Sequence, residues 1–294
     1  MEKAKVYFTK DITPDSLVNI FDALQIELNG KTAIKISTGE PGGHNFLNPN
    51  LIKDLITKVD GTIVECCTAY GGKRMAVADH LKTIEDHGFK AIAPCDIMDA
   101  SGEMELPIKD GFHLDKDIVG ANFKNYQSMI VLSHFKGHAM GGFGGALKNM
   151  SIGIASSRGK TYIHTASKTS DPKLLWDSLP PQDHFLESMA DACKGIIDYM
   201  GKENIVYISV ANNLSVDCDC DSHPAPPEMA DIGIFASLDP VALDQACYDA
   251  VINSPDPGKK ALIERMDSRH GIHTVEAAAK LNLGIREYEI ISLD

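Results

Sequence analysis

Residues 128–149 read SMIVLSHFKGHAMGGFGGALKN, and this stretch indicates the fold class more clearly than any other. Four apolar residues in a row, Met129 to Leu132, make a strand that is apolar on both faces. Such strands are typical of parallel sheets covered by helices, because both of their faces are then buried. The glycine-rich run that follows, with a helix expected to begin near Lys148, predicts a strand, a loop and a helix in succession.

Similar apolar runs alternate with amphipathic stretches along the rest of the chain. Two helix starts are marked by an N-cap residue followed by proline, at Thr13-Pro14 and at Asp239-Pro240. The alternation predicts an α/β fold with a mostly parallel sheet and helices on both faces. The expected strands are 5–8, 32–37, 61–65, 90–93, 128–133, 204–211 and 231–237, and the further expected helices are 74–87, 182–200, 258–268 and 273–281.

The size of the chain suits one large core. It has 294 residues, of which 44% are hydrophobic, and it contains no repeats or low-complexity segments. We therefore expect a single α/β domain over 1–294. The proline-bearing stretch 165–183 is the candidate for a sub-boundary or for the place of a lost insertion.

Charge and hydropathy narrow the range of partners. The net charge of -13 repels phosphate backbones and anionic lipid, which argues against nucleic acid and membrane as partners. The first residues hold no apolar stretch of signal-peptide length, and no run of about 18 apolar residues occurs. A cytoplasmic location is therefore expected, where the seven cysteines would be thiols.

The loop after residue 133 has the composition of a binding site. His134 and His138 lie four residues apart with Lys136 between them, and imidazoles can ligate a metal or carry protons. Dense glycine lets backbone N–H groups converge on an anion, and a helix start near Lys148 would favour the same charge. The alternative is a glycine-rich turn whose histidines bond to the backbone. The candidate anion- or cofactor-binding residues are Gly141, Gly142, Gly144, Gly145 and Lys148.

A second segment, DCDCDSH at 217–223, carries two cysteines at C-x-C spacing. The sulfurs of Cys218 and Cys220 can reach one soft or borderline metal, and the flanking carboxylates can support it. With His134 and His138 they form the candidate metal ligands, for zinc or iron. The alternative is a polar surface loop whose cysteines are incidental.

A third segment, STGEPGGHNFLNP at 37–49, follows the expected strand 32–37. Glu40 and His44 flank its Pro-Gly-Gly turn and are a candidate acid–base pair, although an ordinary strand-to-helix turn explains them equally well. Lys35 lies within the preceding apolar strand, where a lysine needs a partner or faces a ligand. Together with Lys136, Glu40 and His44 are the candidate catalytic residues.

Longer strings resemble a known family. IKISTGEPG (34–42), GGKRMAVADHLKTIEDHGF (71–89), HFKGHAMGGFGGALKN (134–149), CDC (218–220) and DIGIFASLDPVALDQAC (231–247) are similar to the DUF362 family of iron–sulfur-centre proteins. Many members carry a ferredoxin-like insertion with two C-x-x-C-x-x-C-x-x-x-C-P clusters, and this sequence has none. The resemblance therefore implies the core of the family without its [4Fe–4S] module. The residues that match motif positions of that core are His134, Lys136, His138, Cys218 and Cys220.

Two main functions fit these features. The first is a metal-dependent enzyme, redox or not, that acts on a small anionic substrate; since related chains carry clusters, it would receive electrons from an external carrier. The second is a non-catalytic protein that binds a metal or a small anion. A weaker third reading is a hydrolase in which Glu40 or His44 is the general base toward a metal-bound water. The sequence alone leaves enzyme and binding protein open.

Overall fold

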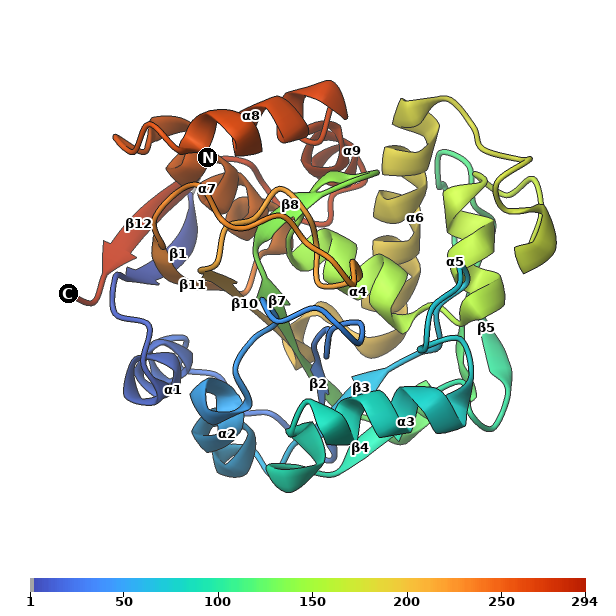
Figure 1. Cartoon of the computed structure of the whole chain (residues 1–294), viewed down its shortest axis with the longest axis horizontal. Helices are drawn as coiled ribbons and strands as arrows, with labels where there is room; N and C mark the ends of the chain where they lie inside the picture. Colours follow the sequence, from blue (N-terminus) through green and yellow to red (C-terminus); the bar gives the residue numbers. More distant parts are fainter. Residues whose placement is uncertain (1–2) are drawn as a thin grey trace.

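The computed structural model describes residues 3–294, in which eight strands form one mixed sheet (Figure 1). The strand order is β12-β1-β11-β10-β7-β2-β3-β4. Only β11 runs antiparallel to its neighbours, and all other pairs are parallel. The strands are β1 (Ala4–Thr9), β2 (Thr32–Lys35), β3 (Thr62–Glu65), β4 (Cys95–Ile97), β7 (Ser128–His134), β10 (Ile205–Ala211), β11 (Gly233–Ser237) and β12 (Tyr288–Ser292).

Helices cover both faces of this sheet, as predicted. Successive residues of β7 point to opposite faces, so Ile130 packs with one set of helices and Val131 with the other. The first set is α1 (Pro14–Ala23), α2 (Pro49–Lys58) and α3 (Val77–Asp86). The second set includes α4 (Ala146–Ile154), α6 (Gln182–Met200), α7 (Pro240–Asn253), α8 (Lys259–Ser268) and α9 (His273–Lys280). The mostly parallel α/β fold expected from the two-sided apolar strands is therefore confirmed.

The remaining elements are short. Two hairpins lie outside the main sheet, β5 (Glu103–Pro107) with β6 (Lys116–Gly120), and β8 (Lys136–His138) with β9 (Gly142–Gly144). Helix α5 (Ser157–His164) follows α4, and the proline-bearing stretch 165–183 connects it to α6. Among the helices of residues 3–294, none combines the length and hydrophobicity needed to cross a bilayer.

One expected strand is wrong. The run 90–93 lies in a short 3₁₀ turn, Phe89–Ala91, in which Ile92 N donates to Phe89 O. Gly88, with a φ of 86°, turns the chain before it, and Ile92 and Ala93 are apolar because they pack against the core beside the buried Phe89. The edge strand β4 begins at Cys95, just after Pro94, which has no N–H to donate to a ladder. The pattern also did not predict β5, β6, β8, β9, β12, α2 or α5.

Candidate metal and anion site

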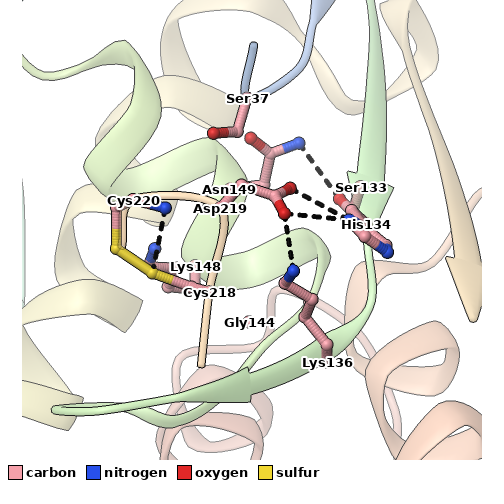
Figure 2. A pocket seen from close by; sticks show the side chains of 11 residues that line it. Ser37, Ser133, His134, Lys136, Gly144, Lys148, Asn149, Cys218, Asp219 and Cys220 are labelled. Carbon is pink, nitrogen blue, oxygen red and sulfur yellow. Dashed lines mark hydrogen bonds and ion pairs between the residues drawn. A yellow bond between two sulfur atoms is a disulfide. The ribbon is translucent and has the colours of Figure 1, made fainter. Parts of the chain in front are cut away.

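The two segments that the sequence singled out leave the same edge of the sheet. In the parallel pair β7–β10, His134 lies opposite Val210, so the loops after them start side by side. Gly137 N donates to Ser215 O at 2.9 Å, which joins the loops. A Cβ on Gly137 would lie 2.3 Å from Val216 O, so this approach requires glycine. Both segments line one pocket (Figure 2).

Asp219, between the two cysteines, organises the polar side of this pocket (Figure 2). Its Oδ2 lies 2.9 Å from His134 Nδ1, and its Oδ1 lies 2.6 Å from Lys136 Nζ. Burial alone would raise the pKa of the Asp219 carboxyl group, but the charges and hydrogen bonds of His134 and Lys136 outweigh it and lower that pKa to about 2. Asp219 therefore remains ionised and fixes both basic side chains.

This arrangement removes His134 from the expected set of metal ligands. Its Nε2 lies 2.7 Å from the carbonyl oxygen of Asn212, and its Nδ1 faces Asp219. Both ring nitrogens thus have oxygen partners, and His134 lies outside the group of ligand-type atoms that the cysteines form. His134 instead positions the loop that carries the cysteines. Lys136, the predicted catalytic lysine, is likewise held by Asp219 and is 1% exposed.

The other expected ligands do come together. His138, Cys218 and Cys220 each offer one ligand atom, and these atoms lie within 4.8 Å of one another. The two cysteines are joined by a disulfide, with Cα atoms 5.2 Å apart, which corrects the expectation of free thiols at these positions. A tight turn, in which Asp221 N donates to Cys218 O, brings the sulfurs together. The other five cysteines are free, as expected.

The orientation of His138 is set by the hairpin turn. Its Nδ1 accepts hydrogen bonds from Met140 N and Gly141 N at 3.2 and 2.9 Å. Burial, followed by the charge of Lys148, lowers the pKa of His138 well below its usual value, so the ring is neutral. The proton of that neutral ring is on Nε2, which lies 3.9 Å from Cys220 Sγ. Ligation by the neutral ring through Nε2 therefore requires this proton to move to Nδ1, which would break the hydrogen bonds from Met140 N and Gly141 N.

A second pocket adjoins the first, shares Lys148 and Cys220 with it, and is lined by cations. Lys35 Nζ bonds to Asn149 Oδ1 at 3.1 Å, which supplies the partner that a lysine in a buried strand was expected to need. Lys160 Nζ donates to Ala155 O. Lys148 lines both pockets. Burial and the neighbouring cations lower the pKa of Lys148 to about 7. Burial also lowers the pKa of Lys35, to about 8, although the negative charge of Glu65 opposes this shift.

The positive charge of this pocket exceeds the negative charge around it. Arg74 is the fourth cation, and its Nε donates to Glu40 Oε2 at 2.7 Å and its Nη1 to Glu65 Oε1 at 3.3 Å. Four cations thus face two carboxylates, which favours an anion as the ligand.

The start of α4 does not bind that anion, contrary to the sequence-based expectation. The carboxylate of Asp244 accepts hydrogen bonds from Ala146 N at 2.7 Å and from Leu147 N at 3.0 Å. These are the N–H groups that an anion at the helix start would need. Attraction for an anion therefore comes from side chains, with Lys148 foremost, rather than from the helix end.

The four glycines expected to bind a ligand divide into two pairs. Gly144 and Gly145 line the first pocket. Gly141 and Gly142 instead form the turn of the β8–β9 hairpin and do not line the pockets described above; Gly142 has a φ of 78° and packs closely against Gly271. The hairpin and its close packing therefore explain glycine at these two positions.

Glu40 and His44 do not form the expected acid–base pair. The Glu40 carboxylate is bound by Lys73 N and Arg74, and Gly43 N closes a turn onto Glu40 O. This turn directs His44 outward, where it is exposed. Glu40 is therefore a structural partner of Arg74, and a base at this position would first have to give up that ion pair.

Several site residues were given no role from the sequence. Asn149 Nδ2 donates to the carbonyls of Lys35 and Leu132 and so ties α4 to two strands. Lys160, on α5, was not singled out, and Asp244, on α7, lies in the family-like string 231–247 but was assigned no function. Only the position of Asp219 between two cysteines could have suggested its role.

Two solved structures are similar to this chain at low sequence identity. Among solved structures, the lactate racemase apoprotein from Thermoanaerobacterium thermosaccharolyticum has 12% sequence identity and a TM-score of 0.49, over 84% of this chain and 57% of that chain. A protein from Thermotoga maritima has 10% identity and a TM-score of 0.41, over 91% of this chain and 58% of that chain. This chain thus spans less than two thirds of either structure.

No curated protein matches the sequence. A family model described as "Domain of unknown function (DUF362)" matches residues 32–249, which is more than half of the chain. The chain therefore belongs to the DUF362 family.

Proposed function

We propose that this protein is a metal-dependent enzyme that acts on a small anionic substrate at the junction of the two pockets. The observation that carries the proposal is the position of Cys220, which belongs to the sulfur–imidazole group and also lines both pockets. A metal held by Cys218 and Cys220 would therefore lie beside the cationic surface that binds the substrate.

The donor set suits a borderline metal. Two sulfurs and one imidazole are ligands that zinc and iron accept, provided that the disulfide is reduced. A metal bound there would polarise an oxygen of the substrate. Lys148 and Lys35 would hold the negative charge of the substrate, and Asp219 would keep Lys136 and the cysteine loop in place.

Sulfur ligation gives the sharpest test. Reduced, anaerobic protein loaded with Co²⁺ should show thiolate-to-metal charge-transfer absorption, which only a sulfur ligand produces. The C218S/C220S variant should lack this absorption, whereas C95S, which removes a free cysteine elsewhere, should retain it. Reduced wild-type protein without charge-transfer absorption would rule the metal site out.

A second candidate function is favoured by the disulfide itself. Cys218 and Cys220 could act as a redox dithiol, with the Nε2–H of His138 directed at Cys220 to stabilise its thiolate. Formation of the disulfide from two thiols releases two electrons and two protons, which an external electron carrier would accept. In that case H138N should raise the pKa of the Cys220 thiol, measured by thiolate absorbance, without any dependence on metal.

A further inference from the structure

A second group of histidines and carboxylates lies at the start of α6, and it shares no residue with the two pockets described above. It contains two sets of three ligand-type side chains. Within each set, one ligand atom per residue lies within 4.8 Å of the others. The first set is His113, His184 and Glu187, and the second is Asp183, His270 and His273.

Glu187 connects the two sets. Its Oε2 lies 2.6 Å from His113 Nε2, and its Oε1 lies 3.2 Å from His273 Nε2. In the second set, Asp183 Oδ1 lies 2.7 Å from His270 Nδ1. His273 Nδ1 faces Glu276 Oε2 at 3.4 Å, so a carboxylate lies behind the ring, as is common for metal-binding histidines.

The side chains are held by a scaffold on α6. The buried carboxylate of Asp191 accepts hydrogen bonds from Phe112 N, His113 N and Leu114 N, at 2.7, 2.7 and 3.0 Å. This fixes the loop between β5 and β6. Gln182 Nε2 donates to Arg269 O at 2.8 Å and so fixes the turn that carries the next histidine.

The β5–β6 loop and the turn from α8 into α9, which are distant in sequence, thus both lie against the first turns of α6 (Figure 1). The rings of His113 and His184 lie 4.4 Å apart, and those of His270 and His273 lie 4.9 Å apart. Four imidazoles and two carboxylates, donor types that borderline metals accept, thus gather at the start of α6.

We propose that this cluster binds divalent transition-metal ions such as Zn²⁺, with Glu187 as the carboxylate shared by its two halves. Imidazole nitrogen with carboxylate oxygen is a donor set that Zn²⁺ accepts. The inference does not depend on the function proposed for Cys218 and Cys220. The simpler alternative is a network of ion pairs that clamps α6 to its neighbours without metal.

The test measures Zn²⁺ in full-length protein from which the cysteine site has been removed. The C218S/C220S variant is stripped with chelator, titrated with Zn²⁺ and followed by calorimetry and by thermal unfolding. We expect binding and a rise in the unfolding temperature, since Zn²⁺ would bind the folded state only. Adding E187Q should weaken binding by more than the roughly 10–100-fold that loss of an outer partner costs.

Two further variants keep the outcome clear if E187Q unfolds. His270 is half exposed, so H270N should leave the fold intact, as checked by circular dichroism, and still weaken Zn²⁺ binding. H223Q removes another exposed histidine, outside both sets, and should bind as the parent does. If the parent variant binds no Zn²⁺, or if E187Q and H270N bind it as tightly as H223Q does, the cluster is an ion-pair clamp and the proposal is wrong.

Discussion

At the scale of the residue, the charge of Lys148 depends strongly on its surroundings. It lies on α4 among the buried cations Lys35, Lys160 and Arg74, and these lower its pKa to about 7 after burial has had the largest effect. Below that pH the amine is charged and attracts an anion; above it the amine is neutral and the attraction is lost. Since an anion in the pocket favours the charged form, binding above pH 7 must take up a proton.

This gives a prediction for sulfate or oxalate as probes, whose charge does not change near neutral pH. Their affinity should fall by up to about tenfold for each pH unit above the pKa of Lys148. Calorimetry in buffers of different ionisation enthalpy should detect the proton uptake. K148M should abolish most of the affinity and leave only the pH dependence that Lys35 contributes near pH 8, whereas K109M, at an exposed position, should change neither. Affinity independent of pH in wild-type protein would contradict this role.

At the scale of the element, α4 owes its position to a side chain from another helix. Asp244 on α7 binds the first two N–H groups of α4, and Asn149 on α4 binds the ends of β2 and β7. The two glycines beside this start line the pocket, so any shift of α4 moves Lys148 relative to the cysteine loop.

We therefore predict that D244A affects both stability and binding. Loss of the carboxylate leaves two buried N–H groups without partners, which should lower the free energy of unfolding by about 1–3 kcal/mol in denaturant titrations. The matched control is D239A, because Asp239 caps α7 through Val241 N and Ala242 N in the same way. D239A should destabilise the protein but leave sulfate binding unchanged. Equal sulfate affinity in D244A and wild type would show that α4 does not need this cap to position Lys148.

Elements differed in how far the sequence predicted them. β7 and β10 were predictable because both of their faces are buried, which requires consecutive apolar residues that can be recognised in the sequence. The hairpin β8–β9 was not, because its residues KGH and GFG carry no strand pattern and are fixed by pairing with each other and by the hydrogen bond from Gly137 N to Ser215 O. Such contacts depend on partners about 80 residues away and leave no local periodicity.

At the scale of the whole molecule, buried carboxyl groups make stability depend on pH. Burial raises the pKa of Asp117 from 3.8 to about 7. The folded state therefore keeps a proton that the unfolded chain releases between these values. The stability that the neutral group contributes is complete below pH 3.8 and is lost as the pH rises through about 7.

We predict that D117N, which carries no titrating proton, weakens the fall in unfolding free energy between pH 4 and pH 7. It should therefore gain stability relative to wild type as the pH rises through this range, as measured by urea unfolding at a series of pH values. D177N, at an exposed aspartate, is the control and should follow the wild-type curve. A D117N curve parallel to wild type would mean that Asp117 does not titrate on unfolding.

By itself, the sequence determined the α/β class, the coverage of both sheet faces and the segments that carry the chemistry, because burial and glycine-rich turns are local properties of the chain. Only the tertiary structure decided which of those side chains are available to bind a metal or an anion. In the folded protein His134 is paired with Asp219, His44 is exposed, and the first N–H groups of α4 are bound by Asp244. The tertiary structure also gathers histidines without any motif onto α6. The physical reason is that hydrogen-bond and charge partners are chosen by distance in space, and the strand order of the sheet sets those distances.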